Sequence, residues 1–127
     1  QAFLSTANWL EKLPDTEKPF ERVEGVDSPF EYNIRVWDEA RRHAVDFLGE
    51  VRTHLDDPGA GELLEQARVH YHDVQVELVA ILEGLESAGN GDLRVGFAGK
   101  LRSAAETEQS AIDCLRRLTS DDSLQVR

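Results

Sequence analysis

One stretch of the chain decides its fold class: SPFEYNIRVWDEARRHAVDFLGEVRTHLDDPG, residues 28–59. It opens with a serine, a proline and, three residues after the serine, a glutamate. Ser28 can accept a hydrogen bond from the Glu31 amide while the Glu31 carboxylate reaches back, and Pro29 suits the first helical position because it has no N–H. This capping box predicts that a helix starts directly after Ser28.

The rest of that stretch has the periodicity of an amphipathic helix. Its apolar residues recur every three or four positions: Phe30, Ile34, Trp37, Ala40, Ala44, Phe47, Leu48, Val51 and Leu55. Glu31 and Arg35, and likewise Asp38 and Arg42, are spaced as favourable ion pairs on the solvent side. The run Asp56-Asp57-Pro58-Gly59 is expected to end the helix, which is therefore predicted over residues 28–57.

Three more segments carry the same period. Residues 2–13 predict a short helix, and residues 60–87 and 91–119 predict two long ones. Residues 14–28, with two prolines and Gly25, read as an irregular connector, and Gly89-Asn90-Gly91 closes the third helix. The polar residues 120–127 are expected to fray.

These elements predict an all-α chain that forms a single domain over residues 1–127. At 1.5 Å per residue the three long helices would each be about 40 Å long, and short turns between them force antiparallel neighbours. We therefore expect an antiparallel up-down bundle of three long helices, flanked by the short N-terminal helix and its connector.

Composition excludes several classes of function. The chain has 127 residues and a net charge of −11, which argues against unassisted binding of nucleic acid. No apolar run suggests a membrane span, and a lone Cys114 rules out an internal disulfide framework. A cytoplasmic protein is expected, and the acidic excess over only three lysines suggests adaptation to high salt. The absence of Met, with Gln1 at the start, suggests a fragment of a longer chain.

Standard catalytic motifs are missing from the sequence, so an enzyme is not the favoured reading. Cys114 lies next to an apolar stripe and is expected to be a half-buried small hydrophobic residue. Glu108 also lies on an apolar stripe, where a carboxylate needs a partner. One arrangement would place Glu39, His43, His70 and Glu108 around a divalent metal ion. The alternative is structural: Glu108 pairs with Arg41, with Tyr71 or with a histidine, and no cofactor is expected.

Trp9 and Trp37 are the two tryptophans. Both fall at helical spacing with other apolar residues, so we expect them to anchor the core. A small-ligand pocket lined by these aromatic rings, between the first helix and the bundle, is the competing interpretation.

The order of segments resembles one known family. Residues 5–118 carry WLEKLP, FERVEG, YNIRVWDEARRHAVDFLGEV, LLEQARVHYHDVQVELVAILEGL and LRSAAETEQSAIDCLRRL. They are similar to the helical C-terminal region of the butirosin-biosynthesis acyltransferase-like proteins, whose N-terminal part resembles a papain-like cysteine peptidase. Where that family has a glycine-rich approach to the second helix, this chain has Gly25-Val26-Asp27-Ser28-Pro29. The resemblance implies an accessory domain that helps to shape an acyl-substrate cleft, and no catalytic residue carries over.

The function expected from the sequence is therefore non-catalytic. A helical domain would mediate assembly with a protein partner or with another copy, or would shape a substrate cleft in a larger protein. The alternative is a metal-binding helical bundle, acting as a metal-dependent hydrolase or transferase through the histidines and Glu108.

Overall fold

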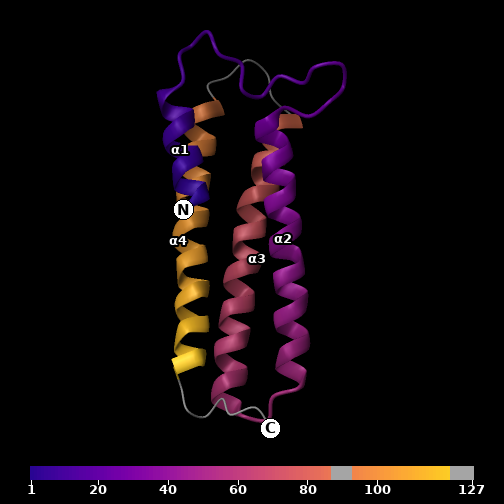
Figure 1. The fold of residues 1–127 in the computed structure, drawn as a ribbon, viewed down its shortest axis with the longest axis vertical. Coiled ribbons are helices and arrows are strands. Elements are labelled where there is room, and N and C mark those ends of the chain that lie inside the picture. Colours follow the sequence, from indigo (N-terminus) through magenta and orange to yellow (C-terminus); the bar gives the residue numbers. More distant parts are fainter. Residues whose placement is uncertain (87–92, 121–127) are drawn as a thin grey trace.

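A computed structural model describes residues 1–86 and 93–120 of the chain. It contains helices α1 (Ala2–Lys12), α2 (Pro29–Thr53), α3 (Pro58–Glu86) and α4 (Leu93–Ser120) (Figure 1). Within these ranges the only β-type pairing is an isolated bridge between Val23 and Val26, across a tight turn at Glu24 and Gly25. The predicted all-α class is confirmed.

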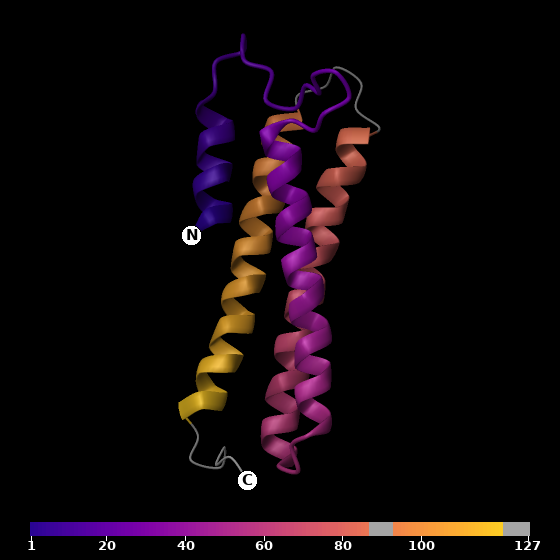
Figure 2. The same cartoon turned by 45° about the vertical axis from the view of Figure 1, so that its right-hand side comes forward.

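The helices are arranged lengthwise. α2, α3 and α4 extend along most of the long axis of the molecule, and each runs opposite to the one before it (Figure 1). α1 packs on α4 and accompanies only its upper half, so that the N-terminus lies midway along the bundle (Figure 2). The upper end, which carries the connector, thus has four helices in cross-section and the lower end has three.

The start of α2 follows the predicted capping pattern. The Ser28 hydroxyl accepts a hydrogen bond from the Glu31 amide at 3.1 Å, and Pro29 is the first helical residue. The Glu31 carboxylate, however, binds the side chains of Arg22 and Arg35. It is 2% exposed, so the predicted solvent-side pair with Arg35 is in fact buried on the carboxylate side.

The turn between α2 and α3 corrects two predicted boundaries. α2 ends at Thr53, earlier than expected, where the Thr53 hydroxyl donates to the Glu50 carbonyl. α3 begins at Pro58, because the Asp57 carboxylate accepts the Gly59 amide at 2.9 Å and the proline takes the first helical position. The segment predicted only to stop one helix therefore also starts the next.

Other predicted boundaries fall differently. α1 ends at Lys12, one residue before the predicted end. The ends predicted at residues 87 and 91, the Gly89-Asn90-Gly91 turn and the tail 121–127 lie outside the described residues.

The core has an upper and a lower part. The upper cluster joins all four helices and consists of Phe3, Ala7, Leu10, Phe30, Ile34, Val74, Leu78, Ile81, Phe97, Ala98, Leu101, Ala104 and Ala105. The lower cluster joins α2, α3 and α4 and consists of Leu48, Ala60, Leu64, Ala67, Cys114 and Leu118. Cys114 is buried, more deeply than predicted, with its Sγ 3.8 Å from Gln66 Oε1.

Several residues expected in the core are on the surface. Phe47 is 63% exposed although its neighbour Leu48 is buried, and Trp9 is 47% exposed, so Trp9 does not anchor the core. Trp37 is half-buried and packs edge-on against Phe3, with ring centroids 5.2 Å apart. On α3, Val69 and Val76 are exposed as well. The apolar stripes are therefore broader than the core that they build.

Candidate functional site

The four residues predicted as metal ligands do not converge. Glu39 and His43 form an exposed pair on α2, with Oε1 and Nε2 3.7 Å apart. Both lie on the side of α2 opposite its buried row, whereas Glu108 of α4 is buried and His70 of α3 is half-buried. Within residues 1–86 and 93–120, no group of three or more histidine, cysteine or acidic side chains is placed to hold a metal ion.

Glu108 instead lies at the centre of a polar cluster midway along the bundle. Its Oε1 is 2.7 Å from an Arg41 guanidinium nitrogen, and its Oε2 accepts the Gln1 side-chain amide at 3.1 Å. The Arg41 guanidinium also lies over the Phe3 ring, 4.8 Å from its centroid. The structural alternative, in which Glu108 pairs with Arg41, is the one that the structure contains.

Tyr71 of α3 borders this cluster. Burial raises the pKa of its hydroxyl, and the negative charge of Glu108 raises that pKa further, while Arg41 opposes the shift. The phenol is therefore held neutral. The cluster offers no free base or nucleophile, because its one carboxylate is already bound by a cation.

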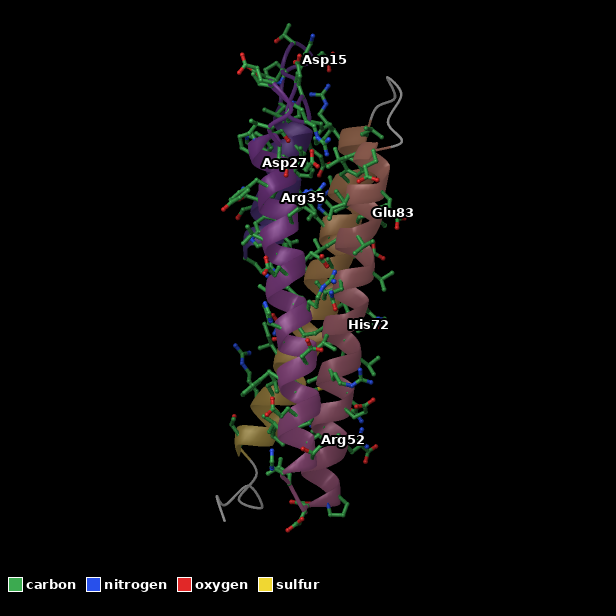
Figure 3. All side chains as sticks on the ribbon, turned by 90° about the vertical axis from the view of Figure 1, so that its right-hand side faces the viewer. Asp15, Asp27, Arg35, Arg52, His72 and Glu83 are labelled. Carbon is green, nitrogen blue, oxygen red and sulfur yellow. The ribbon has the colours of Figure 1, made fainter. Side chains whose placement is uncertain are left out.

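Two other buried carboxylates are also neutralised. Glu31 is bound by Arg22 at 2.5 Å and by Arg35 at 2.8 Å, and these hydrogen bonds lower its pKa to about 2. Figure 3 shows Arg35 beside Asp27 at the upper end of α2, where the two pair at 3.1 Å. The buried charges of the molecule thus hold helices and connector together.

Asp38 makes the equivalent link between α2 and α3. Its carboxylate is 3.1 Å from Arg42 in the predicted pair, and it accepts the Gln75 side-chain amide of α3 at 3.3 Å. Like Glu31, it is buried although its helical spacing alone suggested the solvent side.

The surface below α1 is the strongest candidate for function. Trp37, Ala44 and Val51 are seven residues apart and therefore share one side of α2, the side that contacts Phe3 of α1. On α4, Ala105 and Ile112 are related in the same way, and Ala105 is buried in the upper cluster with α1. Both rows continue past the point where α1 begins.

We call the continuation of these rows the lower face. It consists of Ala44, Phe47 and Val51 on α2 and of Ile112 and Leu115 on α4. Phe47 is exposed and the other four are half-buried. Seven residues earlier, beside α1, Ala105 and Glu108 of α4 are buried, whereas on α2 Trp37 is half-buried and Ala40 is exposed. The lower face is an apolar surface that lacks the covering helix present above it.

Sequence reasoning missed this surface because it placed Phe47 in the core. One signal could have revealed it: the first helix is predicted to be less than half as long as its neighbours, so it cannot cover them along their whole length.

Two shallow hollows lie elsewhere. One, of about 400 Å³, lies at the turn between α2 and α3 and is lined mainly by charged side chains, with Leu55 and Pro58. The other, of about 310 Å³, lies on the outer side of α3 around Val76 and His72, a histidine that Figure 3 marks midway along that helix. Neither is lined by Trp9 or Trp37, so neither is the ligand pocket expected from the tryptophans.

The function of this chain has to be inferred from its geometry, because comparisons with other proteins give no match. No protein-family model, curated protein or solved structure matches the chain. Among the helices described, none is long and apolar enough to cross a membrane.

Proposed function

We propose that this chain is a non-catalytic assembly domain, built as an antiparallel up-down bundle of three long helices and one short one. Its working surface is the lower face. The acidic remainder of its surface keeps the protein hydrated and limits contacts elsewhere.

A single observation carries this proposal: Phe47, a large aromatic residue, is 63% exposed beside the half-buried Ala44 and Val51 on α2. Contiguous exposed apolar surface of this kind is typical of protein–protein contacts, and aromatic residues are enriched in their centres. Within residues 1–86 and 93–120 the buried carboxylates are Glu31, Asp38 and Glu108. Each is already bound in a structural ion pair, which supports the non-catalytic part of the proposal.

Other expectations stay predictions. The likeness to the helical region of the butirosin-biosynthesis acyltransferase-like proteins is compatible with an assembly role, in which the bundle would serve a larger enzyme. The cytoplasmic location and the adaptation to high salt are likewise predictions. The metal-binding alternative is weakened, because Glu108, one of its four proposed ligands, forms an ion pair with Arg41.

Light scattering coupled to size-exclusion chromatography tests the assembly role. At moderate salt, to screen the net charge, we expect a mass above 14.3 kDa that grows with protein concentration. A mass of 14.3 kDa at every concentration from low micromolar to several hundred micromolar would contradict self-assembly.

A further inference from the structure

We infer that the outer side of α3 is a second docking surface, and that its occupant is a basic amphipathic helix of a partner protein. This surface consists of α3 residues alone, whereas the lower face belongs to α2 and α4, so the inference goes beyond the proposed assembly role. Three features of α3 support it: an exposed row of residues with the spacing of an interhelical seam, a hollow in that row, and acidic charge without basic charge around it.

α3 carries two rows of residues with coiled-coil spacing, one on each side of the helix. The buried row packs on the other helices and consists of Leu64, Ala67, Tyr71, Val74, Leu78 and Ile81, three and four residues apart in turn. A second row repeats that spacing with Val69, His72, Val76, Val79 and Glu83. Val76 follows the buried Val74 by two residues, or about 200° around the helix, so the second row lies opposite the core. We call this second row the outer seam.

The outer seam is open to solvent. Val69 is 42% exposed, Val76 is 52% exposed, and Val79 is half-buried. Apolar residues scattered singly on a surface are ordinary, but these valines share one side of one helix at the spacing of interhelical contacts. A helix with apolar residues on two opposite sides is typical of one that other helices cover on both sides. The pattern therefore favours a helix as the occupant.

A hollow in this seam offers a place for an apolar anchor. The hollow of about 310 Å³ is lined by His72, Gln75, Val76, Val79, Ala80 and Glu83. Figure 3 marks two of these residues, His72 toward the lower end of the outer seam and Glu83 toward the upper end. At one edge, the Gln75 side chain is held by Asp38 of α2 at 3.3 Å. An aliphatic side chain of a partner helix can thus enter between the valines, with polar groups at the rim.

Charge decides the chemistry of that partner. From Val69 to Glu86, α3 contains the acidic residues Asp73, Glu77, Glu83 and Glu86 and no lysine or arginine. Asp73 and Glu83 are exposed. A helix with lysine or arginine beside its apolar stripe is attracted to such a surface, whereas an acidic helix is repelled. The same acidity that limits contact with other acidic proteins therefore selects a basic one.

A second copy of this chain fits the outer seam poorly. Parallel pairing of two outer seams places Glu83 against Glu83. Antiparallel pairing about Val76 places each Glu83 against Val69 of the other copy, where the carboxylate would lose water without gaining a partner. Each copy also has a net charge of −11, so the two repel each other. These conflicts favour a different protein of opposite charge.

Fluorescence anisotropy with a designed, labelled peptide tests the docking. The probe is a helix of about 18 residues, which matches the length of about 26 Å from Val69 to Glu86, with leucine along one seam and lysine or alanine elsewhere. One control peptide has the same composition with its leucines spread around the helix, and another has glutamate in place of lysine. At about 0.15 M salt, we expect the probe to bind at least about 10-fold more tightly than either control.

Val76→Glu is the decisive variant, because it removes an apolar contact and adds a negative charge. Docking on the outer seam predicts that the probe binds this variant about 10-fold more weakly or worse, whereas attraction by charge alone predicts tighter binding. Val36→Glu is the matched control, because Val36 is a 43% exposed valine of α2 that gains the same charge outside the seam. It should leave the dissociation constant within about threefold of wild type.

Asp73→Lys tests the role of charge. Its carboxylate is exposed beside the outer seam, so the reversal should weaken binding of the lysine probe several-fold and strengthen binding of the glutamate peptide. Circular dichroism and thermal melting of every variant verify that it is folded, as expected for substitutions at exposed positions.

The outcomes separate this docking from the assembly role. Equal binding of the probe and the shuffled peptide, or unweakened binding to Val76→Glu, overturns the docking. A probe that Phe47→Glu excludes and Val76→Glu retains is bound at the lower face, which also overturns it. So does a wild-type dimer that Val76→Glu dissociates, because a second copy then occupies the seam. A probe that prefers wild type over both Val76→Glu and Asp73→Lys supports the docking, whatever light scattering shows for the assembly of the chain alone.

Discussion

Glu31 lies at the top of α2 between two guanidinium groups, one from the connector and one from its own helix. Arg35 could be foreseen from the four-residue spacing, but Arg22 could not, because its position depends on the path of the connector. Together they let a carboxylate with 2% exposure remain charged. The buried ion pair therefore ties the irregular connector to the bundle.

The pH dependence of stability should report this site. The folded-state pKa of Glu31 is about 2, below the value of about 4.3 in an unfolded chain. Because the folded pKa is depressed, this group stabilises the fold fully above that unfolded value and less as the pH falls toward 2. Urea unfolding of Glu31→Gln should show a loss of about 2 kcal/mol at pH 7 and a much smaller one near pH 2.5.

Glu65 serves as the matched position for that experiment. Its pKa is also lowered, chiefly by Arg68, but it lies partly exposed. Glu65→Gln should cost well under 1 kcal/mol at pH 7. Equal losses for both variants, or a loss at Glu31 that does not change with pH, would contradict the role given to the buried pair.

At the scale of helices, α3 and α4 pack most tightly at a glycine, judged over the described glycines. Near the upper end of the bundle, Gly84 of α3 lies against the ring of Phe97, and a Cβ at Gly84 would be 2.9 Å from Cε1 of that ring. Phe97 belongs to a group of three rings, with Phe20 from the connector and Phe30 from α2, whose neighbouring centroids are 4.9 to 6.0 Å apart. Lack of a side chain at Gly84 lets α3 and α4 approach closely there.

Two glycine substitutions should therefore have opposite signs. In an open helix position alanine is favoured over glycine by about 1 kcal/mol, and Gly99 of α4 has no atom within 4 Å of a new Cβ. Gly99→Ala should raise the free energy of unfolding, whereas Gly84→Ala should lower it because the Phe97 ring must shift. Chemical denaturation monitored by circular dichroism measures both, and stabilisation by Gly84→Ala would refute the close packing.

For the molecule as a whole, charge is the dominant surface property. A net charge of −11 on 127 residues makes the folded chain repel itself. Many of its arginines already engage carboxylates, and this excess of negative charge remains on the surface.

Stability should consequently rise with salt. Between about 0.01 M and about 1 M salt the Debye length falls from about 30 Å to about 3 Å, which screens the repulsion. Differential scanning calorimetry at pH 7 should show a melting temperature that increases with sodium chloride. The increase should be smaller near pH 5, where fewer carboxylates are charged, and a melting temperature that falls with salt at pH 7 would contradict the expectation.

The sequence by itself determined the helical class, the cap of α2 at Ser28 and the need of Glu108 for a partner. The helical class and the cap follow from the spacing of residues along the chain. The need of Glu108 for a partner follows from its position on an apolar stripe, because burying a lone charge is costly in free energy. It could not choose between Arg41, Tyr71 and a histidine as that partner, since the choice depends on which helices are neighbours and at what height.

Only the tertiary structure decided which apolar residues became surface. Phe47 and Leu48 are adjacent and differ by 100° around α2, so both fit one broad stripe, yet only Leu48 faces α3 and α4. Ala40, seven residues before Phe47 and beside α1, is exposed as well, so this side of α2 faces solvent above and below the start of α1. Which part of the broad apolar stripe is buried thus depends on where α3 and α4 lie around α2, which no residue pattern within α2 could reveal.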